Sequence, residues 1–193
     1  MFDSDIFGPI ARFLEMVAEL KLRCVVGGSV ASSLQGLPRQ TIDLDVVVEL
    51  EEVDIPRLVE AARRHFYVSD AAVLEAVRHR RGFNLIHGGT SFKIDVYVSG
   101  DTEFDRQQFA RAVDARLPGL EGHVLRLASA EDVILRKLEW CRLGNEVSDR
   151  QWYDVMGVMK VQSSRLDDAY LDRWADQRGL SELLARARRE STE

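Results

Sequence analysis

Thr41-Ile42-Asp43-Leu44-Asp45-Val46-Val47-Val48 is a stretch in which every second residue, from Ile42 onward, is apolar. This is the period of a β-strand that buries one face, so Asp43 and Asp45 point to the same open side. Their carboxylates are about 7 Å apart along such a strand. They repel each other unless a cation or water lies between them. The stretch therefore indicates a Mg²⁺ site.

A second alternating stretch, Ser91 to Val98, carries another carboxylate. Its even-numbered residues are apolar, whereas Lys93, Asp95 and Tyr97 share the other face. The preceding residues Phe83 to His87 and the turn at Gly88-Gly89 predict a hairpin that ends in this strand. If the strand shares a sheet and a core with the first stretch, Asp95 joins Asp43 and Asp45 on one face. Three carboxylates would then converge.

Upstream, Cys24-Val25-Val26 predicts a short buried strand, and Gly27-Gly28-Ser29 turns the backbone into a helix over residues 30–35. Free N–H groups at the helix start, the Ser29 hydroxyl and two glycines without side chains form a cradle of phosphate size. A triphosphate fits between this cradle and bound metal ions. Arg39 and Thr41 share the carboxylate face, where Arg39 could contact a phosphate or, as an alternative, orient Asp43 through a salt bridge.

Lys137 lies in the middle of the apolar face of a helix predicted from Ser129 to Gly144. An unpaired ammonium in apolar surroundings is costly, so Lys137 should meet an anion. The anion is either a nucleotide phosphate or a carboxylate, Asp149 or Asp154, and the side chain could instead extend to solvent. Asp154 also lies four residues after Arg150, which allows a local helical ion pair.

Together these motifs resemble the nucleotidyltransferase fold of the DNA polymerase β superfamily, and within it the AbiEii-like and related small bacterial nucleotidyltransferases. The resemblance spans about residues 20–160 and includes two downstream motifs, Glu131-Asp132-x₄-Lys137 and Asp149-Arg150-Gln151-Trp152-Tyr153-Asp154. One departure is Gln151, where AbiEii-like proteins usually have the first Asp of the second motif.

The resemblance implies an α/β fold of the α+β type, with a mixed β-sheet flanked by helices and a C-terminal helical segment. It implies transfer of NMP from an NTP to a hydroxyl acceptor, with release of pyrophosphate. The implied catalytic and metal residues, which hold two Mg²⁺ ions, are Asp43, Asp45 and Asp95. The implied nucleotide-binding residues are Gly27, Gly28, Ser29, Arg39, Thr41 and Lys137, with Asp149 and Asp154 as accessory residues. The alternative is a non-catalytic nucleotide-binding protein or toxin–antitoxin component that keeps the fold.

Length and composition predict a core over residues 1–127 and a C-terminal helical segment over residues 128–193, packed on the core. The net charge of −6 argues against a strongly basic, non-specific nucleic-acid binder. The expected partners are an NTP and an RNA such as tRNA or a cognate partner protein. Two cysteines without metal-ligand spacing, and the lack of a signal sequence or membrane-length apolar run, predict a cytoplasmic protein that does not enter membranes.

The periodicity also predicts a helix from about Glu103 to Arg116, with Phe109, Ala112 and Val113 facing inward. His123 to Leu127 is expected to be an edge strand. Beyond it, the pattern predicts three further helices at about residues 148–161, 166–177 and 180–190.

Overall fold

The computed structural model describes residues 6–144 and 149–191 and divides the chain into two compact units. The sheet unit contains the chain up to Gly27 together with Gln40–Leu127, and the helical unit contains Gly28–Arg39 together with Ala128–Glu193. These units share the boundary after Leu127 with the expected domains. They differ from them in Gly28–Arg39, which the sequence prediction placed in the core. Residue 148, where one helix was expected to start, lies outside the described residues.

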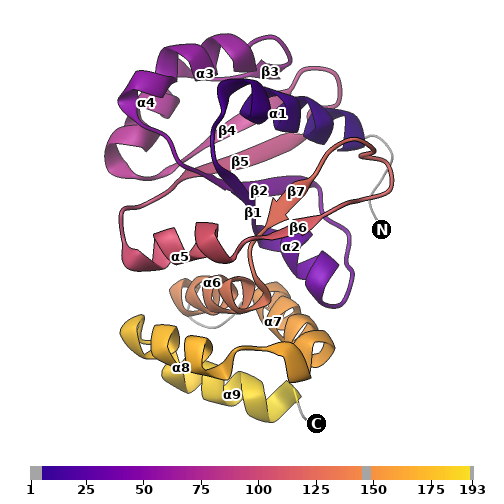
Figure 1. Ribbon diagram of the computed structural model, residues 1–193, viewed down its shortest axis with the longest axis vertical. Helices are drawn as coiled ribbons and strands as arrows, with labels where there is room; N and C mark the ends of the chain where they lie inside the picture. Colours follow the sequence, from indigo (N-terminus) through magenta and orange to yellow (C-terminus); the bar gives the residue numbers. More distant parts are fainter. Residues whose placement is uncertain (1–5, 145–148, 192–193) are drawn as a thin grey trace. The chain divides into compact units, whose positions relative to one another are not determined.

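The sheet unit is built on a seven-stranded sheet with the order β3-β4-β5-β2-β1-β7-β6 (Figure 1). The strands are β1 (Cys24–Val26), β2 (Asp43–Val48), β3 (Phe66–Tyr67), β4 (Gly82–His87), β5 (Lys93–Val98), β6 (Val113–Ala115) and β7 (Leu125–Leu127). β2 runs parallel to β5 and β1 parallel to β7, whereas the other neighbours are antiparallel. The mixed sheet and the β4–β5 hairpin that the sequence predicted are therefore confirmed.

Alternation along β2 and β5 separates a buried face from an open one. Leu44, Val46 and Ile94 are almost fully buried, while the residues between them are only partly buried. Helices of the same unit cover this apolar side: α4 packs against β4 and β5, and α3 contacts both α1 and α4 (Figure 1). The helices of the sheet unit are α1 (Phe7–Leu20), η2 (Glu52–Asp54), α3 (Ile55–Ala62), α4 (Asp70–His79) and α5 (Glu103–Arg111).

The end of α5 corrects one sequence prediction. The helix stops at Arg111 instead of Arg116, because Ala112 has an extended backbone with ψ of 135° and Val113–Ala115 pair with β7. Val113 is 45% exposed and does not face inward as expected. The same pairing makes β6 the edge of the sheet, so the prediction that His123 to Leu127 form an edge strand is wrong.

The helical unit consists of α2 (Gly28–Gln35), α6 (Ala130–Leu143), α7 (Asp149–Gln162), η3 (Ser163–Arg165), α8 (Asp168–Gln177) and α9 (Ser181–Ser191). α2 packs against α6 and α7, while α8 contacts α6 and α9 contacts α7 (Figure 1). The approach of α2 to α7 requires glycine, since a Cβ on Gly36 would lie 2.6 Å from the backbone nitrogen of Val158. None of the described helices has the length and hydropathy needed to cross a lipid bilayer.

Candidate active site

A row of polar groups crosses the open face of the sheet. Asp45 on β2 is the register partner of Asp95 on β5, and Asp95 is in turn the partner of Asn84 on β4. On the far side of β2, the N–H of Gly27 donates a hydrogen bond to the Asp45 carbonyl (2.9 Å). The parallel pairing of β2 with β5 thus brings two of the predicted carboxylates side by side.

The third predicted carboxylate, Asp43, lies two residues before Asp45 and therefore on the same face. Its register partner is Lys93. Thr41, a buried residue, donates from its hydroxyl to Asp43 Oδ1 (3.0 Å) and to the Asp43 carbonyl (3.2 Å). The predicted nucleotide-binding residue Thr41 therefore orients a carboxylate.

Lys93 is a cation on this face. Its Nζ lies 2.7 Å from Asp95 Oδ2, and the other oxygen of Asp95 accepts from the Asn84 amide (2.5 Å), whose orientation follows from this hydrogen bond. The hydrogen bond to Asp95 raises the pKa of Lys93, and the charges of Asp43 and Asp45 add to the rise, although partial burial acts against it. A single ammonium thus interacts with all three carboxylates.

Tyr97, two residues beyond Asp95, is affected by the same charges. Burial raises its pKa to about 12, and the negative charges of Asp45, Asp95 and Asp43 contribute to that rise. The phenol is therefore neutral at physiological pH. The raised pKa of Tyr97 is a second indication that the three carboxylates lie close to one region of the sheet.

The side chains on this face can be compared with the ligands that the predicted Mg²⁺ ions require. Carboxylate oxygens are the ligands that Mg²⁺ prefers, and the ammonium of Lys93 shows that the row accommodates positive charge. In the part of the chain that the structure describes, no three His, Cys, Asp or Glu side chains are already arranged around one metal position. Asp43 and Asp95 are engaged instead by Thr41 and Lys93. The three carboxylates suit a divalent cation in their chemistry, and a metal that binds Asp95 Oδ2 would compete with Lys93 for that oxygen.

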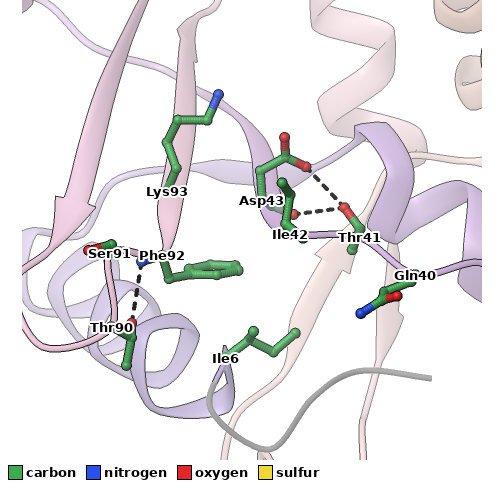
Figure 2. A pocket seen from close by; sticks show the side chains of 9 residues that line it. All are labelled: Ile6, Gln40, Thr41, Ile42, Asp43, Thr90, Ser91, Phe92 and Lys93. Atoms are coloured by element: carbon green, nitrogen blue, oxygen red, sulfur yellow. Dashed lines mark hydrogen bonds between the residues drawn. The ribbon is translucent and has the colours of Figure 1, made fainter.

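A pocket of about 490 Å³ opens beside Asp43 and Lys93, at the ends where β2 and β5 begin (Figure 2). Apolar side chains line it from three segments, Ile6, Ile42 and Phe92, and the remaining lining residues are Gln40, Thr41, Thr90 and Ser91. Figure 2 shows the polar ends of Asp43 and Lys93 extending away from its apolar part. The pocket therefore joins the charged row to an apolar surface within the sheet unit.

The predicted phosphate cradle lies at the start of α2: Gly27 ends the first segment of the sheet unit, and Gly28 and Ser29 begin the helical unit. Gly28 has φ of +54°, a left-handed conformation that favours glycine, and α2 starts there. No described atom lies within 4 Å of the position a Cβ would take on Gly27. The Ser29 hydroxyl accepts a hydrogen bond from Arg39 Nη2. The turn therefore has the glycine conformation that the sequence prediction required, with its hydroxyl held by a cation.

Arg39, Asp154 and Lys137 form a charged triad in the helical unit, in which Asp154 and Lys137 are buried and Arg39 is partly exposed. Arg39 binds Asp154 through two hydrogen bonds, Nε to Oδ1 (2.7 Å) and Nη2 to Oδ2 (3.1 Å), and Lys137 Nζ lies 2.7 Å from Oδ2. The side chains of Lys137 and Asp154 are 6% and 1% exposed. Of the partners proposed for Lys137, Asp154 is the one it contacts. Arg39 also pairs with Asp154, a partner that the sequence did not predict for it, since the expected partners were a phosphate or Asp43.

Two opposing effects set the protonation of Asp154. Burial on its own would raise the pKa of this carboxyl, but the hydrogen bonds and charges of Arg39 and Lys137 outweigh it and lower the pKa below the ordinary value. Asp154 is therefore ionised, and the triad carries a net charge of about +1, from two cations and one anion.

The remaining motif residues have different surroundings. Asp149 is exposed at the first residue of α7. Glu131 and Asp132 are buried: Glu131 accepts from the Asp167 N–H (2.9 Å) and Asp132 from the Tyr170 hydroxyl (2.7 Å). The Oε1 of Gln151 is buried without a hydrogen-bond partner among the described residues. Glu131 and Asp132 therefore stabilise the helical unit.

Sequence reasoning assigned no role to Lys93 or Asn84. Both alternate correctly with the buried residues of their strands, so the pattern placed Lys93 on the polar face. Their contacts with Asp95 depend on the order and register of β4 and β5, which alternation does not reveal.

No protein-family model matches the sequence, and no curated protein matches it. Among solved structures, the antibiotic-resistance factor ANT(2'')-Ia in solution matches with 15% identity and a TM-score of 0.53, covering 92% of this chain and 97% of that chain. ANT(2'')-Ia in complex with adenylyl-2''-tobramycin matches with 17% identity and a TM-score of 0.51, covering 89% and 99%. A nucleotidyltransferase-like protein from Paracoccidioides brasiliensis matches with 15% identity and a TM-score of 0.54, covering 94% and 90%. These similarities confirm that the chain has the nucleotidyltransferase fold.

Proposed function

We propose that this protein is a metal-dependent nucleotidyltransferase that transfers NMP from an NTP to a hydroxyl acceptor and releases pyrophosphate. The observation that carries the proposal is the side-by-side placement of Asp45 and Asp95, with Asp43 on the same open face of a nucleotidyltransferase fold. A carboxylate row of this kind has a chemical use when a cation and a triphosphate bind to it.

Asp43, Asp45 and Asp95 would hold two Mg²⁺ ions. Such ions, when bound, balance the charge of the triphosphate and of the oxygens that enter and leave at the α-phosphorus. Thr41 keeps Asp43 oriented toward the open face. Asp95 would accept the proton of the acceptor hydroxyl as the new oxygen–phosphorus bond forms and the bond to pyrophosphate breaks.

The β- and γ-phosphates would bind at Gly27, Gly28 and Ser29, at the start of α2, where the N–H of Gly27 is already bonded to the Asp45 carbonyl and the first N–H groups of the helix would meet the phosphates. Arg39 and Lys137 would add positive charge there, and Asp154 would hold both cations in place. In this proposal Lys137 has a phosphate and a carboxylate as simultaneous partners.

The acceptor is a hydroxyl of an RNA 3′ end, a protein side chain or a small molecule. The pocket of about 490 Å³ beside Asp43 supports a small molecule, because pockets of 300–1,000 Å³ suit such ligands. A nucleotidylated small molecule, adenylyl-2''-tobramycin, is bound in one of the similar structures of ANT(2'')-Ia. We therefore infer that a small-molecule hydroxyl is the acceptor to test first.

Membership of the AbiEii-like group, a cytoplasmic location, and a tRNA or cognate protein as partner belong to the same proposal. They rest on the motif resemblance and on two free cysteines, Cys24 and Cys141, which suit a reducing compartment. The rival function is a nucleotide-binding or toxin–antitoxin protein without turnover, which Gln151 in place of Asp favours.

The test is pyrophosphate release and labelling of acceptor pools from each of the four NTPs with Mg²⁺, for wild type, Asp45→Asn and Asp95→Asn. We expect each variant to lose at least about 100-fold in rate, since it removes a charge from the reacting region. The matched control is Asp114→Asn, an exposed carboxylate on the edge strand β6, which should keep wild-type activity. Nucleotide binding without turnover by the wild type would support the rival function.

A further inference from the structure

The contact between Lys93 and Asp95 has a consequence for metal binding. Lys93 Nζ lies 2.7 Å from Asp95 Oδ2, and Lys93 is the register partner of Asp43 on the neighbouring strand. The ammonium is thus bracketed by one carboxylate on its own strand and another across the ladder. Figure 2 shows Asp43 and Lys93 extending in the same direction from the pocket.

The carboxylates on this face give the Lys93 ammonium an electrostatic role. Asp43, Asp45 and Asp95 bring three carboxylates to this face, and Lys93 brings an ammonium that contacts one of them. A divalent cation bound by the carboxylates would take over the role of that ammonium. Without the cation, Lys93 reduces the repulsion between adjacent Asp45 and Asp95.

Lys93 and a metal ion compete for the same oxygen. A Mg²⁺ ion binds carboxylate oxygens at about 2.1 Å, and an ammonium within hydrogen-bond distance of that oxygen would lie close to the ion and be repelled by it. The Asp95 side chain is 14% exposed, whereas Lys93 is 42% exposed on a flexible stem. Lys93 can therefore move outward into solvent, while Asp95 stays in its place on β5.

We propose that Lys93 is a built-in counter-ion of the carboxylate row, which leaves Asp95 when a divalent cation binds and thereby sets the affinity of the metal site. This inference rests on the proposed function, because it requires that the three carboxylates hold metal. Lys93 acts as a positioning residue: it holds Asp95 before metal binds and is displaced afterward.

The experiment measures Mn²⁺ affinity without nucleotide, from the loss of the free-ion electron paramagnetic resonance signal, for wild type and Lys93→Met. Removing the competing charge should tighten binding by about threefold to tenfold. Lys93→Arg keeps the charge and should bind Mn²⁺ as the wild type does. Arg23→Met removes a positive charge that pairs with Glu49 at the other end of the β1–β2 pair, and it controls for net charge. Thermal melts show that each variant is folded.

Unchanged or weaker Mn²⁺ binding by Lys93→Met overturns the counter-ion role. If Asp45→Asn abolishes binding at the same time, the metal site and the proposed function stand without this inference. Absence of Mn²⁺ binding to both wild type and Lys93→Met overturns the inference and the metal-dependent function together. If Arg23→Met tightens Mn²⁺ binding as Lys93→Met does, the effect comes from net charge alone, and the counter-ion role of Lys93 is likewise overturned.

Discussion

The sheet unit and the helical unit each contain a cluster of opposite charges, and the two clusters differ in burial. In the sheet unit, Lys93 is 42% exposed and pairs with Asp95 through one oxygen. In the helical unit, Asp154 is 1% exposed and is bound by Arg39 through two hydrogen bonds and by Lys137 through a third. One cluster is open to exchange with solvent ions, and the other is closed.

The difference follows from what each environment allows. A buried charge must keep its partners, since leaving it unpaired costs several kcal/mol, roughly 3–5 for a broken buried pair. A partly exposed pair contributes less than about 1 kcal/mol and can be exchanged for another ion. The triad therefore stabilises its helices, whereas the carboxylate row retains the freedom that metal binding needs.

The largest effect is expected for Asp154→Ala, which leaves the buried Lys137 and the partly exposed Arg39 without their shared carboxylate. The free energy of unfolding should fall by about 3–5 kcal/mol, measured by urea denaturation. Asp168→Ala on α8 removes an exposed carboxylate that pairs with Arg188, and it should change stability by less than about 1 kcal/mol. An equal loss of unfolding free energy in Asp154→Ala and Asp168→Ala would contradict the expected difference between buried and exposed ion pairs.

Lowering the pH should also reduce the stabilisation that the triad contributes. The pKa of Asp154 is lowered in the folded protein from its ordinary value of 3.8, so its stabilisation is present above that value and is lost as the pH falls through the folded pKa. The difference in unfolding free energy between wild type and Asp154→Asn should therefore shrink below about pH 4. Denaturation midpoints of both proteins across the acidic range measure this difference. A gap that stays constant would show that ionised Asp154 adds nothing.

Lys137→Met should have a smaller effect than Asp154→Ala, because Asp154 keeps both hydrogen bonds from Arg39. We expect a loss of about 1.5–3 kcal/mol, the contribution of one hydrogen bond to a charged group. The same variant should also show a smaller rise in melting temperature with NTP and Mg²⁺. If Lys137→Met lowers the unfolding free energy as expected but leaves the rise in melting temperature with NTP and Mg²⁺ unchanged, Lys137 has only a structural role.

The smallest effect on stability is expected in the carboxylate row. In metal-free solution, Asp45→Asn should change the unfolding free energy by less than about 1 kcal/mol, since relief of repulsion from Asp95 offsets the weaker attraction for Lys93. Urea midpoints in the presence of a chelator give the value. A loss as large as that of Asp154→Ala would mean that the row is a structural network.

Alternation was enough to place Asp43 and Asp45 on one face of their strand, because strand periodicity is a local property. Placing Asp95 beside them also required the assumption that both strands share a sheet, which the structure bears out. The contacts of the charged residues, by contrast, join segments that are far apart in the sequence. Asp45 meets Asp95 through a parallel register between segments 50 residues apart, and Arg39 meets Asp154 across 115 residues. The sequence left several partners open for Lys137 for the same reason. The wrong helix end after Arg111 also reflects tertiary pairing, since β7 recruits Val113–Ala115 into the sheet.

The most direct test of nucleotidyl transfer is a pair of reactions with NTP labelled at the α-phosphate or at the γ-phosphate, each with Mg²⁺ and small-molecule acceptor pools. The account predicts that the α-label alone appears on an acceptor while the γ-label is released as pyrophosphate, and that Asp45→Asn abolishes both products. Transfer of the γ-label to an acceptor, or no product from either label with any NTP, would contradict it.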